Sequence, residues 1–161
     1  MKLLVFSDSH GISFPLREAM SRAGGADYAI HAGDGAPDII TTAGVFGMTP
    51  VAVRGNCDLG SDLPSECTLI VEDIRILVVH GHKFGVKSSL SPLIVEARRR
   101  GVDLVIFGHT HEKCEKYIPA DENNGSRPLR LFNPGCARGG DFGVIEIRGG
   151  DVLMSHGNVY D

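Results

Sequence analysis

The hydrophobic positions of this chain fall into short continuous runs, separated by polar segments that contain glycine. Such runs are typical of strands that are buried on both faces. The pattern predicts strands over residues 2–7, 27–32, 50–54, 68–72, 75–80 and 103–108, and later over 116–119, 128–133, 143–148 and 152–156.

Helix signals lie between several of these runs. Each predicted helix has proline or serine near its start and glycine just after its end, as helix termini prefer. The predicted helices run from Pro15 to about Ala23 with Ser13 as the cap, over 38–43 between Pro37 and Gly44, and from Ser89 or Ser91 to Arg100 before Gly101.

The order of these elements predicts the fold class. Strands and helices alternate in the first third of the chain, which predicts parallel strands with helices packed on the sheet. The last third is β-rich and includes a hairpin turn at Gly149-Gly150-Asp151. No repeat or linker interrupts the 161 residues. We therefore expect one α/β domain over residues 1–161, with two packed sheets and helices outside.

Composition and charge limit the expected cellular location and the expected partners of the protein. No stretch approaches the ~18 apolar residues of a membrane span, and Met1-Lys2 enters a strand without a signal-peptide pattern, so we expect a cytoplasmic protein with no membrane partner. The net charge of −4 argues against duplex nucleic acid as the main partner. The 4 cysteines form no CxxC pair, which predicts reduced thiols. A homo-oligomer is compatible with this composition.

Metal-binding residue types follow five of the apolar runs directly. Ligands at the carboxyl ends of successive strands of one sheet can converge on one crevice. No run needs these residues in order to fold, so their joint placement indicates a metal site. The set contains four imidazoles, two carboxylates and one amide: Asp8, His10, Asp34, Asn56, His80, His109 and His111.

This donor set fits two metal ions better than one, because a catalytic zinc uses about three protein ligands. Two ions ~3.5–4 Å apart need a bridging carboxylate, for which Asp34 after Gly33 is the candidate. His109 and His111 are two residues apart, so in extended backbone they point the same way and can reach one ion each. Imidazole and carboxylate ligands suit Mn²⁺, Fe, Co²⁺, Ni²⁺ or Zn²⁺ better than Mg²⁺ or Ca²⁺, and Mn²⁺ is the first expectation.

As an ordered set, these motifs resemble the calcineurin-like metallophosphoesterase superfamily. The chain length, Asn56-Cys57-Asp58 and Asn133-Pro134-Gly135 resemble its small prokaryotic phosphodiesterase branch. The resemblance implies a four-layer αββα sandwich of two mixed β-sheets flanked by helices. It also implies a first metal on Asp8, His10 and His111, a second on Asn56, His80 and His109, and Asp34 between them.

The resemblance implies hydrolysis of a small phosphodiester by in-line attack of a metal-bridging hydroxide, with Asp34, Asn56 and His109 as catalytic residues. A phosphomonoesterase on the same site is the first alternative. A non-catalytic interaction scaffold, like the retromer subunit of this fold, is the second. A nuclease is the third, but no large capping domain or basic groove is visible.

One position departs from many members of this family, in which a histidine follows the asparagine and protonates the leaving group or holds the phosphate. Cys57 stands there instead, and a thiol is the poorer acid. The proton donor stays open between Asp58, His82, a metal-bound water and none.

The sequence also predicts roles for five further residues. Arg54 and Arg138 are candidate phosphate clamps. His31 is expected to be structural, His156 to be incidental, and Cys136 to be an inert buried thiol.

Overall fold

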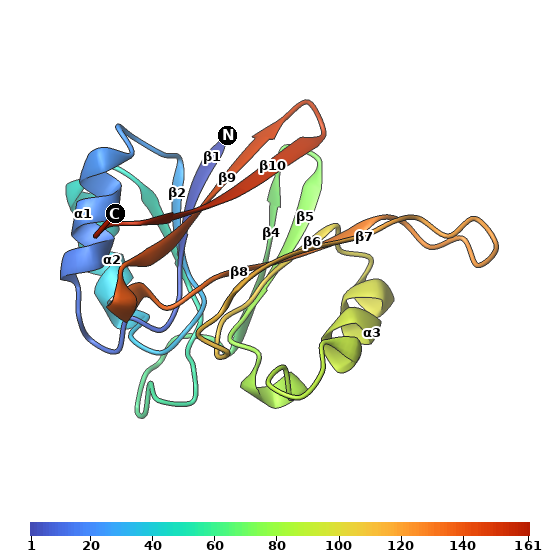
Figure 1. Ribbon diagram of the computed structural model, residues 1–161, viewed down its shortest axis with the longest axis horizontal. Helices are drawn as coiled ribbons and strands as arrows, with labels where there is room; N and C mark the ends of the chain where they lie inside the picture. The colour runs from blue at the N-terminus through green and yellow to red at the C-terminus, as the bar shows by residue number, and fades with distance from the viewer.

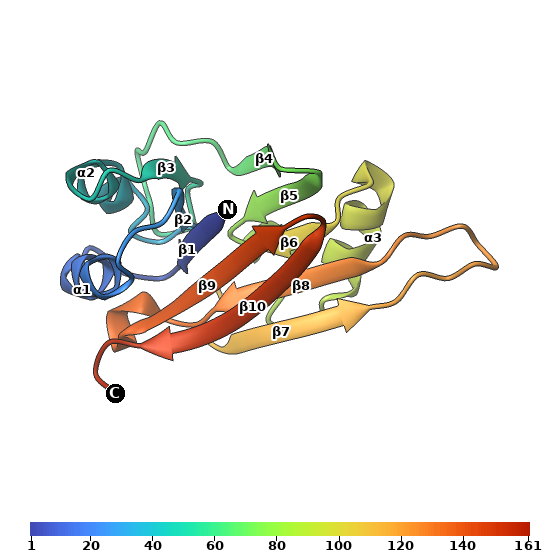
Figure 2. The ribbon, with the colours of Figure 1, turned by 90° about the horizontal axis from the view of Figure 1, so that it is seen from above.

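The computed structural model describes all 161 residues and shows two five-stranded sheets packed face to face (Figure 1). Helices α1 (Phe14–Arg22) and α2 (Pro37–Val45) lie on the outer side of one sheet. Helix α3 (Ser91–Arg100) lies on the outer side of the other (Figure 2). The four-layer α/β sandwich of two mixed sheets is therefore confirmed.

The first sheet has the order β10-β9-β1-β2-β3. Its parallel strands are β1 (Lys2–Phe6), β2 (Tyr28–His31) and β3 (Thr49–Ala52), as the alternation of strands and helices predicted. Strands β9 (Asp141–Arg148) and β10 (Asp151–Asn158) form an antiparallel hairpin along the free edge of β1.

The second sheet has the order β4-β5-β6-β8-β7. Its parallel strands are β5 (Ile74–Val79), β6 (Leu104–Ile106) and β8 (Leu129–Pro134). The antiparallel strands β4 (Glu66–Val71) and β7 (Lys113–Ile118) form its two edges.

The continuous hydrophobic runs reflect strands with two buried faces. In β1, Leu3 and Val5 pack in the core between the sheets, whereas Leu4 and Phe6 pack beneath α1 and α2. Side chains alternate between the faces of a strand, so each run supplies two cores at once. β5 and β6 divide their side chains in the same way between the inter-sheet core and the core under α3.

Several element boundaries differ from the predicted ones. Ser13 occupies the N-cap position of α1 but makes no capping hydrogen bond through its side chain, and α2 continues through Gly44 to Val45. The cap residue of α3 is Leu90 rather than a serine. β7 begins at Lys113, because its polar first half pairs with β8 and tertiary pairing outweighs composition there.

The prediction that His156, which lies in β10, is incidental is wrong. Its Nε2 contacts the carbonyl oxygen of Asn133 at 2.8 Å, and its ring stacks on Phe132 with centroids 4.6 Å apart. β10 and β8 belong to different sheets. His156 therefore connects the two sheets.

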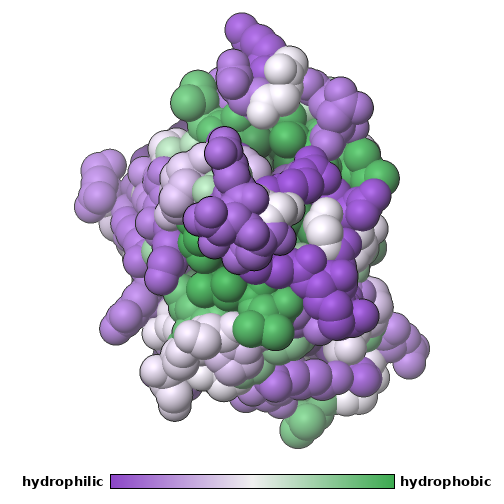
Figure 3. Space-filling model, turned by 90° about the vertical axis from the view of Figure 1, so that its right-hand side faces the viewer, coloured by the Kyte–Doolittle hydropathy of each residue, from purple (hydrophilic) through white to green (hydrophobic).

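No helix of the protein is long and apolar enough to cross a membrane. On the face shown in Figure 3, hydrophilic residues separate the hydrophobic surface into several small patches.

Candidate metal centre

Six of the seven predicted ligands lie in loops that follow parallel strands and meet at one side of the sandwich. These loops belong to both sheets, not to one as first predicted, because β1 and β2 lie in the first sheet and β5 and β6 in the second. The parallel strands of both sheets end at the same side of the sandwich, so the loops that follow them converge. The six residues are Asp8, His10, Asp34, His80, His109 and His111.

The backbone at these loops is unusual. Six non-glycine residues have positive φ, and five of them are predicted ligands: Asp8, His10, Asp34, His109 and His111. Each such conformation costs on the order of 1–3 kcal/mol and is retained mainly where function requires it.

The prediction of extended backbone at His109 and His111 is therefore wrong, since their φ values are 71° and 62°. Their side chains nevertheless reach different groups of donors. His111 lies with Asp8 and His10, and His109 lies with Asp34 and His80.

The first cluster is formed by Asp8, His10 and His111. Nε2 of His111 lies 3.2 Å from Oδ1 of Asp8 and 3.4 Å from Nε2 of His10. The other carboxylate oxygen of Asp8 accepts hydrogen bonds from the Ser7 hydroxyl at 2.6 Å and the His109 amide at 3.0 Å. Oδ1 is buried and has no hydrogen-bond partner. It is therefore free to bind a cation.

The second cluster is formed by Asp34, His80 and His109. Nε2 of His80 lies 3.3 Å from Oδ2 of Asp34 and 3.2 Å from Nδ1 of His109. Nδ1 of His80 donates to the Ala32 carbonyl at 2.8 Å, which leaves the Nε2 lone pair directed at the cluster. Metal-binding histidines are commonly oriented by such a bond.

Electrostatics keeps this cluster ready for a cation. Burial by itself raises the pKa of Asp34. The hydrogen bond from the Cys57 amide and the nearby His80 lower the pKa by more than burial raises it, so the net pKa is below its ordinary value. Burial and the neighbouring His80 lower the pKa of His109. A carboxylate that stays ionised and an imidazole that stays neutral are the forms that bind metal.

The two clusters adjoin at Asp34. Its carboxylate also groups with His10 of the first cluster and with Cys57, and Nε2 of His80 lies 4.0 Å from Oδ1 of Asp8. The nitrogen and oxygen donors can hold two divalent cations with Asp34 between them.

Asn56 lies exposed beside these clusters. Its side-chain amide donates to Sγ of Cys57 at 3.5 Å. The backbone amide of the next residue, Cys57, donates to Oδ1 of Asp34 at 2.8 Å, which holds this loop against the second cluster. The assignment of Asn56 as a ligand stays a prediction.

Cys57 and Asp58 have distinct environments. The Cys57 thiol lies next to Asp34, and a hydrogen bond to that carboxylate raises the pKa of the thiol. Asp58 accepts hydrogen bonds from the amides of Asp34, Gly35 and Gly55 at 2.9, 2.7 and 2.8 Å. Both Asp58 oxygens thus hold the loops after β2 and β3 together, a positioning role instead of proton donation.

Of the other three candidates, the structure places only the ring of His82 beside a predicted ligand. His82 begins the single-turn helix η1 (His82–Phe84), its ring centroid lies 5.4 Å from that of His80, and burial lowers its pKa. Arg54 is exposed, and its Nη1 lies 3.5 Å from the Ser61 carbonyl oxygen. The exposed Arg138 donates its backbone amide to the Asp8 carbonyl at 3.2 Å.

Two further residues position the ligands, and the sequence pattern alone does not identify either of them. Nδ2 of Asn133 donates to the Gly108 carbonyl at 3.1 Å and to the Thr110 hydroxyl at 3.0 Å, which fixes the loop that carries His109. Ser7 holds the carboxylate of Asp8. In the sequence, Asn133 is marked only by the motif Asn133-Pro134-Gly135, and Ser7 only by its place beside Asp8.

His31 is structural, as expected. It is fully buried, its Nδ1 accepts from the Gly33 amide at 3.2 Å, and its Nε2 therefore donates to the Ser9 hydroxyl at 2.9 Å. Burial lowers its pKa to about 3. The neutral ring joins the loops that carry His10 and Asp34.

Close packing at the site requires glycine at position 108. A Cβ atom there would collide with the Ser7 hydroxyl and would lie 2.9 Å from Oδ2 of Asp8. Glycine thus lets the β6 loop approach the first cluster.

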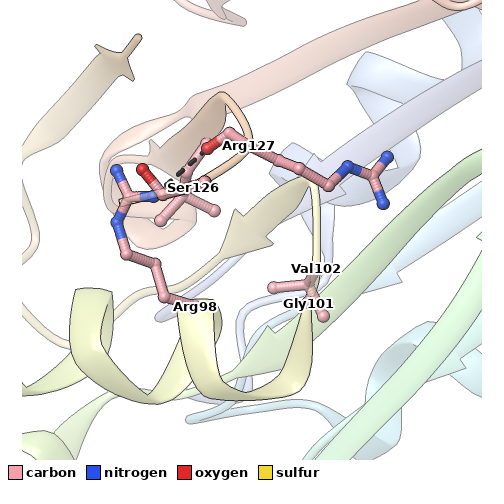
Figure 4. Close-up of a pocket in the computed structure, with 7 residues that line it drawn as sticks. Arg98, Gly101, Val102, Ser126 and Arg127 are labelled. Atoms are coloured by element: carbon pink, nitrogen blue, oxygen red, sulfur yellow. Dashed lines mark hydrogen bonds between the residues drawn. The ribbon is translucent and has the colours of Figure 1, made fainter. Parts of the chain in front are cut away.

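A separate hollow lies between the end of α3 and the segment before β8 (Figure 4). Arg98 donates to the Arg127 carbonyl across it at 3.2 Å. None of the predicted ligands lines this hollow, so it is not connected with the metal centre.

Comparison with known proteins links this geometry to one family. The profile of the calcineurin-like phosphoesterase superfamily domain matches residues 1–146. A probable metallophosphoesterase of Bacillus subtilis is 34% identical over 143 residues, which cover 86% of this chain and 76% of the relative. A probable metallophosphoesterase of Methanocaldococcus jannaschii is 32% identical over 138 residues, covering 84% of this chain and 67% of the relative.

Solved structures share the fold along nearly the whole chain. A predicted phosphoesterase of Streptococcus pneumoniae has a TM-score of 0.78 at 22% identity, covering 99% of this chain and 90% of its own. Vps29 of Entamoeba histolytica, solved in complex with zinc, has a TM-score of 0.72 at 21% identity, covering 99% of both chains.

Proposed function

Because the chain belongs to the calcineurin-like phosphoesterase superfamily, we propose that it is a metal-dependent phosphodiesterase with a binuclear centre, acting on a small phosphodiester. The observation that carries the proposal is Oδ1 of Asp8, which is buried without a hydrogen-bond partner and faces Nε2 of His111. An unpaired buried carboxylate oxygen is costly. A bound cation would supply the missing partner, so the donor set fits the family's metals.

In this proposal Asp8, His10 and His111 hold one ion, Asn56, His80 and His109 hold the other, and Asp34 lies between them. Divalent ions held by these residues would lower the pKa of a bound water towards ~7 and would offset negative charge on the phosphate. The nitrogen and oxygen donors favour Mn²⁺, with Fe, Co²⁺, Ni²⁺ or Zn²⁺ as further candidates.

The chain's own residues support a diester substrate. Cys57 stands where many relatives carry a histidine, and a thiol is a weaker proton donor to a leaving alcohol than an imidazolium, which favours a diester with a good leaving group. Two hollows adjoin the site, one bordered by His10 and Cys57, the other by Gly55 and His82. A diester has an alcohol on each side of phosphorus and can use both hollows, whereas a monoester needs one.

The direct test uses Asp8→Asn and His80→Ala with Mn²⁺ and an aryl phosphodiester. Each variant removes a cluster member, so we expect kcat/KM to fall at least about 100-fold and bound metal, measured by elemental analysis, to fall with it. Arg148→Ala changes an exposed residue at the β9–β10 turn and serves as the control. Undiminished hydrolysis by His80→Ala would refute the proposal.

Comparison of monoester and diester turnover on the same metal-loaded protein separates the proposal from a phosphomonoesterase. The Vps29 structures share the fold, which keeps a scaffold function as the alternative from another class. Failure of the purified protein to bind two metal ions would favour that scaffold.

A further inference from the structure

The two hollows beside the metal centre differ in charge. The hollow bordered by His10 and Cys57 contains the carboxylates of Asp38 and Asp58 and no lysine or arginine. The second hollow is lined by the cations Arg54 and Lys83 and by His82, and it shares the carboxylate of Asp58 with the first. An anion is therefore attracted to the second hollow and repelled from the first.

The second hollow, the basic hollow, adjoins the metal centre without being part of it. None of the six clustered ligands lines it. The His82 ring centroid lies 5.4 Å from that of His80 and 6.1 Å from that of His109. Gly55 forms part of its wall and packs directly against the Asp34 carboxylate. A substrate phosphate at the metals can therefore place a neighbouring group in this hollow.

The charged side chains of the basic hollow form no ion pairs with each other. Neither Arg54 nor Lys83 has a carboxylate oxygen within 4.0 Å, although Arg54 has one weak contact with a carbonyl. The oxygens of Asp58 are occupied by three backbone amides. Nδ1 of His82 is buried and has no partner. The two cationic side chains are therefore available to pair with an anionic ligand.

We propose that the basic hollow binds a second phosphate group of the substrate, so that the preferred substrates are phosphodiesters in which one alcohol carries a further phosphate. This inference rests on the proposed function of the metal centre. The hollow has a volume of about 220 Å³, several times the ~30 Å³ that one water occupies, so a phosphate fits. Arg54 supplies paired N–H donors and Lys83 a point charge. The other alcohol then faces the first hollow, which contains Asp38 and Asp58.

The test compares the dinucleotide ApA with its 5′-phosphorylated form pApA on the metal-loaded protein. We expect wild-type kcat/KM to be about tenfold higher for pApA, because a charge-assisted contact with phosphate is strong. In Arg54→Ala/Lys83→Ala the ratio should fall to about 1, while Arg54→Lys retains most of it. Raising the salt concentration should also shrink the wild-type ratio.

The control is Arg148→Ala, which removes a charge from the opposite end of the first sheet and should leave the ratio unchanged. A wild-type ratio of 1, or a ratio that survives the double variant, overturns the inference. If the protein hydrolyses neither dinucleotide nor an aryl diester, the proposed function fails. The same ratio taken from calorimetric dissociation constants then still decides whether the basic hollow binds phosphate.

Discussion

The polar side chains at the site are of two kinds: the candidate metal ligands, and the residues that hold these ligands in position through hydrogen bonds. The first kind could be predicted, because each follows an apolar run in the sequence. The second kind could not, since Asp58 acts on Asp34 and Gly35 through contacts between two loops. The structural role of His31 could be predicted from its place inside a strand, but its contact with Ser9 could not, because Ser9 lies in the loop after the neighbouring strand β1.

His31 gives a prediction about pH. Its pKa is about 3 in the folded protein, because burial disfavours the charged ring, against about 6.5 in the unfolded chain. As the pH falls from about 6.5 towards 3, only the unfolded chain takes up this proton. Stability is therefore complete above that range and is lost at up to ~1.4 kcal/mol per pH unit within it.

The measurement is urea unfolding of metal-free protein at about pH 7, 6 and 5, compared with His31→Gln. Glutamine can donate and accept hydrogen bonds but does not titrate, so the variant should lose about 1 kcal/mol less per pH unit between pH 6 and 5. Equal slopes for the two proteins would show that His31 does not carry this dependence.

At the scale of the elements, the individual strands could be predicted more easily than the order in which they pair. Continuous apolar runs reported strands buried on both faces, and β1, β5 and β6 have that burial. The sequence did not show which runs share a sheet, since β6 lies between β5 and β8 and not beside its sequence neighbour β7. Nor did it show contacts between sheets, such as that of His156 with Asn133.

The contact between β10 and β8 gives a prediction about stability. His156→Phe keeps an aromatic ring on Phe132 but loses the hydrogen bond to the Asn133 carbonyl, so we expect a loss of about 1 kcal/mol. His156→Ala also loses the stacked ring and should cost roughly 2–3 kcal/mol. Urea unfolding measures both values. An alanine variant as stable as the phenylalanine variant would mean that the stacking contributes nothing.

The two sheets meet over a shared hydrophobic core and also at the metal centre. Asp8, His10 and Asp34 come from the first sheet, while His80, His109 and His111 come from the second. The sequence indicated the donor set, but its distribution over two sheets follows only from the packing. Each proposed ion therefore has ligands from both layers, and its binding favours the assembled sandwich over any state in which the sheets separate.

Metal binding should consequently stabilise the entire fold. An ion at 100 times its dissociation constant adds about 2.7 kcal/mol per site, and each kcal/mol raises the Tm of a domain this size by roughly 2–4 °C. Calorimetry of metal-free protein titrated with Mn²⁺ or Zn²⁺ should show one transition that moves upward and returns with EDTA. Asp8→Asn weakens the first cluster and should show a smaller shift. If metal left the transition unchanged, or displaced only part of it, the ions would not bridge the sheets.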